Sequence, residues 1–378
     1  MKRLAYIDAL RGIAILMVVI VHTSQKVENL PSWLASLSAH GMYGVQLFFL
    51  ISGFSIFLSF ERRRGSENQP LLNFFIRRFF RIAPLFYCAI IFNLIIYGFG
   101  PRYWLGDASE VTWVNIIANF IFINGFNPYW INSVVNVGWA VAIEMQFYLI
   151  APYLYRKVKN LEQAIGLALI VIIFSQILIF LLKGNSLISS DRLWNDYLYL
   201  CLLNQLPVFV LGFVLYFLMI NTGILSKSDR AQTYPSENVL HKRAFLIFII
   251  AIYLSLSIMS NYKIIPKHIA YSLVFLLLTL SLAFHSFSLL VNPLMVEIGK
   301  ISYSIYLLHF PILFKLNQWF SNFLSINEIS LEPIYYFICL FIILIGIVLP
   351  LSYLTNKTIE KKGMIVGNKL ISNFEKKT

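Results

Sequence analysis

The chain has 378 residues, of which 59% are hydrophobic and only 12% are charged, and its formal net charge is +13. Soluble globular proteins carry roughly a quarter charged residues, so this composition excludes an ordinary soluble domain. The apolar runs are continuous rather than alternating, which excludes a membrane β-barrel and predicts an all-α, polytopic membrane helix bundle.

Windows of about 20 apolar residues predict about ten transmembrane helices. The segment 111–124 is apolar but too short to cross comfortably, so it is either a re-entrant or an interfacial helix. The predicted spans, in chain order, lie near residues 8–27, 43–60, 83–100, 136–155, 162–183, 197–220, 244–261, 268–289, 302–323 and 334–355.

Lysine and arginine decide the predicted orientation. If the N-terminus lies in the cytoplasm, most of the 30 basic residues fall on the cytoplasmic side, as the positive-inside rule requires. An even number of spans then places both termini in the cytoplasm. Because membrane topology accounts for the basic charge, no nucleic-acid partner is expected.

The first span contains ionisable side chains that do not suit a lipid-facing helix. In "LRGIAILMVVIVHTS" (10–24), Arg11 precedes the apolar run and His22 lies inside it. Eleven residues make about three helical turns, so Asp8, Arg11 and His22 share one stripe, with His22 near mid-depth. Such a stripe faces the bundle interior or a wet cavity. His22 is then either a structural helix–helix hydrogen-bonding group or a functional imidazole.

Arginines interleaved with phenylalanines precede the third predicted span. In "NFFIRRFFRIAP" (73–84), Arg77, Arg78 and Arg81 lie at the predicted cytoplasmic edge. Arginine binds phosphate through two parallel hydrogen bonds and stacks on aromatic rings. The cluster is either a phosphate site or a set of topology anchors in contact with anionic lipid.

One carboxylate lies well inside a predicted span. Glu144 occurs in "VGWAVAIEMQFYLIAPYLY" (137–155), near mid-depth. An unpaired carboxylate there takes up a proton rather than staying charged, and it is costly in a membrane. We therefore interpret Glu144 as functional and expect a partner, of which His22 is the simplest.

The segment "ISYSIYLLHFP" (301–311) contains the start of the ninth predicted span. Ser302, Tyr306 and His309 fall on nearly one helix face. Pro311 removes a backbone hydrogen bond and predicts a local break. His309 is either functional or a core histidine bonded to a backbone carbonyl.

Five segments together carry a resemblance. Residues 6–22 fit an Arg–ten residues–His arrangement, and "RRFFRIAP" (77–84) contains Arg-x-x-Arg. The other three are "GMYGVQLFFLISGF" (41–54), with FF-x-x-SGF; "GWAVAIEMQFYLIAPYLY" (138–155), similar to W-S-L-x-x-E-x-x-F-Y; and "IGKISYSIYLLHFPI" (298–312), with G-x-x-S-Y-x-x-Y-x-x-H-x-P. In this order they resemble the acyltransferase-3 family of membrane-bound acyltransferases. Ala140 and Val141 depart from the family pattern, which leaves the acceptor open.

The resemblance implies the domain organisation and the activity. Residues 1–357 are expected to form an integral membrane acyltransferase-3 domain and 358–378 a short basic cytoplasmic tail, without the SGNH-type esterase domain that the family often carries. The implied reaction is O-acyl transfer, usually of acetyl, from cytoplasmic acyl-CoA to a hydroxyl of a surface carbohydrate such as exopolysaccharide or lipopolysaccharide. The implied location is the bacterial inner (cytoplasmic) membrane, with lipid bilayer, acyl-CoA and a surface-glycan or lipid-linked sugar as partners.

The same resemblance implies roles for individual side chains. His22 acts either as a general base on the acceptor hydroxyl or as a nucleophile that carries the acyl group, and Glu144 orients it. Acetyl-CoA is a donor substrate; no bound cofactor is expected, and no cluster has metal-ligand spacing. The donor phosphates are held by Arg11, Arg77, Arg78 and Arg81. The supporting residues are Asp8, Trp139, Tyr303, Tyr306 and His309.

Other interpretations stay open from the residues alone. Mid-membrane histidine and glutamate also suit a proton-coupled transporter of a small molecule, although neither paired broken helices nor an internal repeat supports it. A scaffold in a glycan-export complex would need neither side chain. Within the enzyme interpretation, the acyl group is acetyl, succinyl or longer.

Overall fold

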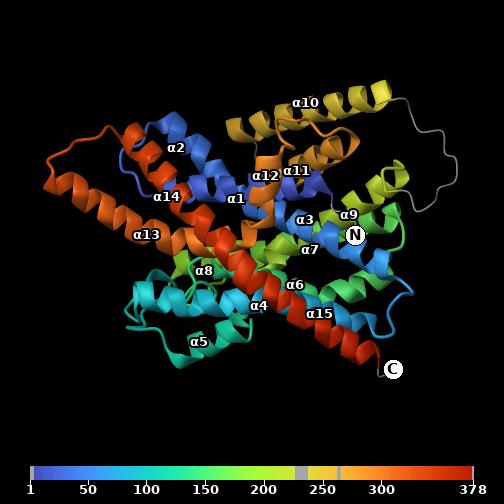
Figure 1. The fold of residues 1–378 in the computed structure, drawn as a ribbon, viewed down its shortest axis with the longest axis horizontal. Helices are drawn as coiled ribbons and strands as arrows, with labels where there is room; N and C mark the ends of the chain where they lie inside the picture. The colour runs from blue at the N-terminus through green and yellow to red at the C-terminus, as the bar shows by residue number, and fades with distance from the viewer. Residues whose placement is uncertain (1–3, 226–236, 262–264, 377–378) are drawn as a thin grey trace.

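The computed structural model describes residues 4–225, 237–261 and 265–376, and every regular element in these ranges is helical (Figure 1). The predicted all-α membrane bundle is confirmed. The α-helices are α1 (Ala5–Ser24), α2 (Ser32–Ala39), α3 (Gly44–Arg63), α4 (Pro70–Tyr97), α5 (Trp113–Phe120), α6 (Gly138–Lys157), α7 (Leu161–Lys183), α8 (Asp191–Leu200), α9 (Leu202–Asn221), α10 (Glu237–Asn261), α11 (Lys267–Phe284), α12 (Pro293–Lys300), α13 (Ser302–Ile326), α14 (Pro333–Thr355) and α15 (Lys361–Glu375). The shorter elements are the 3₁₀ turns η1 (His40–Tyr43), η2 (Tyr103–Leu105) and η3 (Asn124–Phe126), and the π-helical turn η4 (Asn356–Glu360).

Eight helical segments in the described part of the chain are long and apolar enough to cross a membrane, by length and composition. They correspond to eight of the ten predicted spans. The remaining two, 136–155 and 302–323, form the long helices α6 and α13, which carry polar side chains such as Glu144 and His309 in their interiors. The cytoplasmic placement of both termini stays a prediction.

Two segments differ in detail from the sequence expectation, and a third agrees with it. α4 begins at Pro70, well before residue 83, because proline suits a first helical position and no strong helix breaker follows before Pro84. α13 continues through Pro311, so the predicted break is wrong. Within a helix bundle, groups on neighbouring helices can satisfy the backbone carbonyl that a proline leaves without a hydrogen bond. α5 has only eight residues, about 12 Å of helix, so the segment 111–124 does not span.

α3 and α9 approach each other so closely that only glycine fits at their crossing. A Cβ added to Gly53 would lie 2.1 Å from the carbonyl oxygen of Phe209, and one added to Gly212 would lie 2.4 Å from that of Leu50. Membrane helices associate through such close contacts because lipid supplies no hydrophobic drive between them. Gly53 belongs to the "SGF" motif, so this motif fixes the position of the α3 face that carries Ser52.

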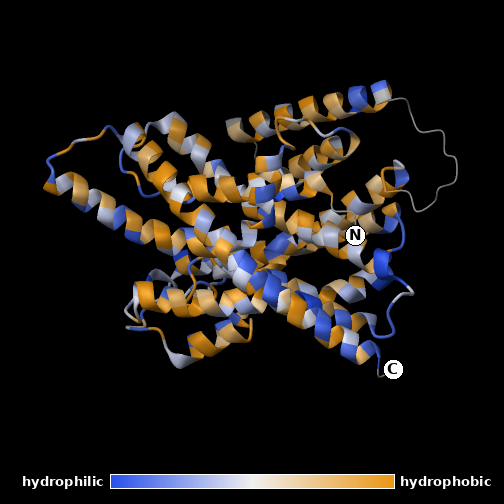
Figure 2. Cartoon of the chain, viewed as in Figure 1, coloured by the Kyte–Doolittle hydropathy of each residue, from blue (hydrophilic) through white to orange (hydrophobic). Residues whose placement is uncertain are grey.

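Most of the expected short basic tail, 358–378, forms the packed helix α15. η4 leads from α14 into α15, which packs along α4, and a Cβ added to Gly363 would lie 2.6 Å from the carbonyl oxygen of Phe80. Figure 2 shows hydrophilic residues gathered on α15, toward the side of the picture where the C-terminus lies. Residues 377 and 378 of the expected tail lie outside the described residues.

Candidate active site

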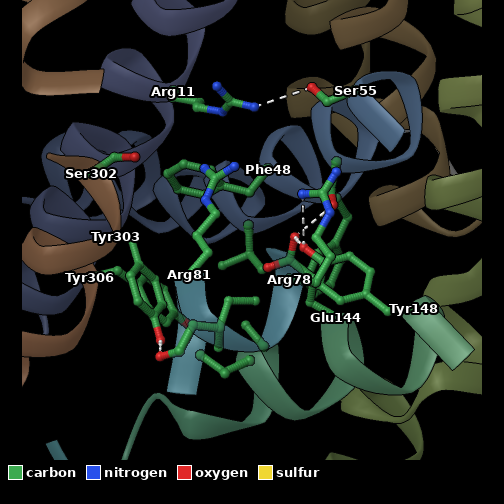
Figure 3. A pocket seen from close by; sticks show the side chains of 16 residues that line it. Arg11, Phe48, Ser55, Arg78, Arg81, Glu144, Tyr148, Ser302, Tyr303 and Tyr306 are labelled. Carbon is green, nitrogen blue, oxygen red and sulfur yellow. Dashed lines mark hydrogen bonds between the residues drawn. The ribbon is translucent and has the colours of Figure 1, made fainter. Parts of the chain in front are cut away.

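A pocket lies where α1, α3, α4, α6 and α13 meet (Figure 3). A cavity of about 90 Å³ lies between its lining atoms. Three arginines and one carboxylate share this space with hydroxyl groups and apolar side chains. The polar and charged lining residues are Arg11, Ser52, Ser55, Arg78, Arg81, Glu144, Tyr148, Ser302, Tyr303 and Tyr306.

Arg11 reaches the pocket from α1 and is held from two sides. One guanidinium nitrogen pairs with Asp8 Oδ1 at 3.1 Å, and the other donates to Ser55 Oγ on α3 at 3.2 Å (Figure 3). Asp8 lies one helical turn before Arg11, as the predicted stripe requires, and its side chain is only 3% exposed. The buried carboxylate therefore anchors a positive charge at the pocket wall.

Arg78 and Arg81 enter the same pocket from α4. The guanidinium of Arg78 lies over two rings, 5.0 Å from the centroid of Tyr148 and 5.7 Å from that of Phe74, and donates to the Tyr148 hydroxyl at 3.5 Å. Stacking occupies the face of a guanidinium and leaves N–H groups at its edge for an anion. Arg81 is exposed and makes no ion pair or hydrogen bond to the residues that the structure describes.

Glu144 has partners other than the predicted one. Its Oε1 accepts a hydrogen bond from Ser52 Oγ at 2.6 Å and another from the Tyr148 hydroxyl at 2.5 Å. His22 is therefore not oriented by Glu144, contrary to the sequence expectation. Tyr148 lies one turn after Glu144 on α6, so this pair was visible in the spacing, whereas Ser52 comes from α3 and depends on how the helices pack.

His22 instead contacts His309. The Nδ1 atom of His22 lies 2.8 Å from Nε2 of His309, and the two rings are almost parallel. Nδ1 of His309 lies 3.1 Å from the carbonyl oxygen of Ile305, which can only accept, so this nitrogen carries the hydrogen. Nε2 of His309 then accepts from Nδ1–H of His22, and the free lone pair of His22 lies on Nε2. We call His22 and His309 the histidine pair.

Tyr306 lies between the pocket space, which it lines, and His309, which its ring contacts. Its ring lines the pocket, its centroid lies 5.9 Å from that of His309, and its hydroxyl donates to the carbonyl oxygen of Val137 at 2.9 Å. Neither member of the pair belongs to the pocket lining. The groups expected to bind a donor and the group expected to carry out the chemistry thus occupy two adjacent regions.

Two predicted site residues lie elsewhere. Arg77 forms a two-pronged ion pair with Glu67, at 2.8 and 3.0 Å, and lines a different cleft. It diverges from Arg78 because consecutive helical residues point about 100° apart. Trp139 packs edge-on against Phe49, with ring centroids 5.7 Å apart, behind the pocket wall.

Some groups at the site were not predicted. Ser52 and Ser55 lie one turn apart on α3, and the spacing alone did not mark them as pocket residues. Glu360, in the segment expected to be a tail, is buried and accepts a hydrogen bond from Ser304 Oγ. Tyr303, which was predicted, lines the pocket and donates to a backbone carbonyl at 2.9 Å. Among the described residues, no group of three or more His, Cys, Asp or Glu side chains could hold a metal ion.

A family model named Acyl_transf_3 and described as "Acyltransferase domain" matches residues 4–353. The chain belongs to the acyltransferase-3 family. Similar curated proteins include O-acetyltransferase OatA of Staphylococcus aureus strains NCTC 8325 / PS 47 and COL, each 26% identical over 378 residues. Each alignment covers 94% of this chain and 57% of the relative, so the chain spans somewhat more than half the length of these relatives. The comparison with solved structures found no match. Family membership and the eight apolar helical segments make this acyltransferase-3 chain a multi-pass membrane protein.

Proposed function

We propose that the chain is a membrane-embedded O-acyltransferase that moves an acyl group, acetyl in the simplest case, from cytoplasmic acyl-CoA to a hydroxyl of a cell-surface carbohydrate. Family membership and the names of the relatives support acyl transfer. The acyl-CoA donor, an exopolysaccharide or lipopolysaccharide acceptor, and the bacterial cytoplasmic membrane are parts of the proposal.

The observation that carries the proposal is the convergence of Arg11, Arg78 and Arg81 on one pocket within the bundle (Figure 3). Guanidinium groups at membrane depth are costly unless an anion or water reaches them. Glu144 is the single carboxylate in the pocket lining, so positive charge is in excess. A donor with several phosphates offsets that excess and binds guanidinium groups through paired hydrogen bonds.

The Nε2 atom of His22 supplies the chemistry. As a general base it takes the proton from the acceptor hydroxyl while the hydroxyl oxygen attacks the thioester carbonyl. The C–S bond then breaks, and the CoA thiolate leaves with the proton that the imidazolium returns. In the other version, Nε2 attacks the thioester carbonyl, the C–S bond breaks and the CoA thiolate leaves. The acceptor hydroxyl then attacks the acyl-imidazole, the C–N bond breaks, and the hydroxyl proton goes to the CoA thiolate. In both versions His309 holds the ring of His22.

Either version requires the thioester to pass Tyr306. The hydroxyl of this residue makes one hydrogen bond, to the Val137 carbonyl. We propose that rotation of this side chain connects the arginine-lined pocket with the histidine pair.

The test is acylation of surface polysaccharide, measured by mass spectrometry, in a strain that lacks other acyltransferases. Cells with the His22→Gln chain are expected to lose the acyl groups at an unchanged membrane level of protein. The matched control is His40→Gln, which replaces a histidine bonded to the Ser36 carbonyl outside the pocket. Acylation that persists at the wild-type level in His22→Gln would contradict the role of this imidazole.

Binding of acyl-CoA to the purified chain separates this proposal from a small-molecule transporter. A transporter has no reason to bind acyl-CoA, so micromolar or tighter binding supports the acyltransferase. The same mass spectrum identifies the transferred group as acetyl, succinyl or longer.

A further inference from the structure

A second cleft lies beside the first pocket, between the end of α3, the loop that follows it, the start of α4 and the end of α6. Four arginines line it, three from the α3–α4 region and one from α6. They are Arg63, Arg64, Arg77 and Arg156. We call this space the second cleft.

The second cleft carries more positive charge than its own carboxylate can neutralise. Glu67 lines it, pairs with Arg77 at 2.8 and 3.0 Å, and approaches Arg63 at 3.6 Å. Arg64 is 72% exposed and contacts a glutamate outside the lining at 3.9 Å. Arg156 makes no ion pair or hydrogen bond with any described residue. Four guanidinium groups around one carboxylate form a surface that suits a phosphate dianion.

The loop that forms one wall of the second cleft is held from outside. Glu375, near the end of α15, accepts hydrogen bonds from the backbone N–H groups of Asn68 and Gln69, at 2.9 and 3.2 Å. The same carboxylate accepts from the Asn73 side chain at 2.5 Å. The C-terminal helix therefore braces the loop that carries Glu67, and the arginines are arranged around a fixed carboxylate.

One ring divides the two cavities. Phe74 lines the second cleft, and its ring lies under the guanidinium of Arg78, which lines the first pocket. Of the consecutive residues Arg77 and Arg78, Arg77 lines the second cleft and Arg78 lines the first pocket. A long ligand with phosphates at one end could therefore contact guanidinium groups in both cavities.

We propose that the second cleft binds the 3′-phosphate of acyl-CoA, while the pantetheine and thioester enter the first pocket past Arg78 and Arg81. The inference rests on the proposed function, since it takes the donor from there. It assigns the phosphate monoester, which can carry two negative charges on one phosphorus, to the more basic of the two cavities.

The experiment compares binding of CoA and of dephospho-CoA, which lacks only the 3′-phosphate. The full chain is placed in nanodiscs of neutral phosphatidylcholine, and the dissociation constants are measured at one salt concentration. The wild-type chain is expected to prefer CoA by about tenfold, as the loss of a charge-assisted contact implies. The double variant R64Q/R156Q is expected to lose this preference and to bind dephospho-CoA as the wild type does.

The matched control is K157Q/K369Q, which also removes two exposed positive charges but alters no residue that lines the second cleft. It is expected to retain the preference for CoA. Equal weakening of both ligands in R64Q/R156Q, or an unchanged preference, would overturn the inference while the proposed donor stands. Failure of the wild type to bind either ligand would overturn the proposed function itself.

A lipid headgroup is the other source of phosphate. The measurements are therefore repeated in nanodiscs that contain anionic phosphatidylglycerol. If this lipid abolishes the wild-type preference for CoA, a lipid occupies the second cleft and the inference is wrong. A preference that persists in anionic lipid supports the inference.

Discussion

The arginine-lined pocket and the histidine pair are built in opposite ways. The pocket draws on five helices, opens outward and keeps guanidinium groups without carboxylate partners, such as that of Arg81. The pair draws on two helices, and its hydrogen bonds occupy every ring nitrogen except Nε2 of His22. The contrast indicates that donor affinity and the rate of transfer depend on different side chains and can be changed separately.

The largest effect that tests this contrast is expected for His22→Gln. Removing a general base costs about 10²- to 10⁴-fold in rate, so acyl transfer by the purified chain should fall at least a hundredfold. The dissociation constant for acyl-CoA should stay within about twofold of wild type, because His22 does not line the pocket. A parallel loss of affinity would show that the two regions are one site.

Substitution of His309 should have the next largest effect. In His309→Ala, Nδ1–H of His22 loses its acceptor, so the ring is no longer held in the tautomer that leaves Nε2 free. We expect transfer to fall about tenfold to a hundredfold at unchanged acyl-CoA affinity. His309→Gln places an amide oxygen near the former Nε2 position and should restore part of the rate. A merely structural role would give no such rescue.

Arg78→Lys tests whether a pocket residue affects donor affinity without affecting the rate of transfer. Lysine keeps the charge but lacks the planar group that lies over Tyr148 and Phe74 and that binds phosphate with two bonds. Acyl-CoA affinity should fall about tenfold, while transfer at saturating donor should change little. Lys369→Gln, an exposed change on α15, serves as the control. A lower saturated rate with normal affinity would assign Arg78 to the chemistry.

The smallest specific effect should follow Gly53→Ala, which lies in neither region. The added Cβ would meet the carbonyl oxygen of Phe209 and force α3 away from α9, at a cost of about 1–3 kcal/mol. Thermal stability in detergent and folded yield should fall, and acyl-CoA affinity should fall by no more than about twofold, because α3 also carries Ser52 and Ser55 of the pocket. Gly166→Ala, where an added Cβ meets nothing within 4 Å, should be neutral or slightly stabilising.

Helical spacing predicted part of the pocket. The interval from Asp8 to Arg11 gave an ion pair. The meeting of Glu144 with Arg78 and Arg81 in one pocket was not predicted, because Glu144 was expected to pair with His22. Hydropathy also predicted each helix of 18 or more residues in the part of the chain that the structure describes, because continuous apolar runs leave few alternatives in a membrane.

Contacts between helices could not be predicted in the same way. Periodicity places His22 and Glu144 at similar depths, but which inward-facing residues meet depends on how each helix is rotated and crosses its neighbours. For the same reason, spacing shows that Arg77 and Arg78 diverge without showing which one faces the pocket. Glu360 was assigned to a tail because lysines dominate its surroundings, and only the packing of α15 on α4 buries it.

The π-helical turn at Asn356–Glu360 determines how α15 is rotated about its axis relative to α14. The number of residues in this turn therefore affects packing as much as their identity does. A π turn holds one residue more than the α-helical path it replaces, so it resets the rotation of everything that follows. Removing one residue here would rotate the downstream helix by about 100°, and Gly363 and Gly367 would no longer face α4. Insertions, fusions and truncations near this end should therefore be designed in whole helical turns.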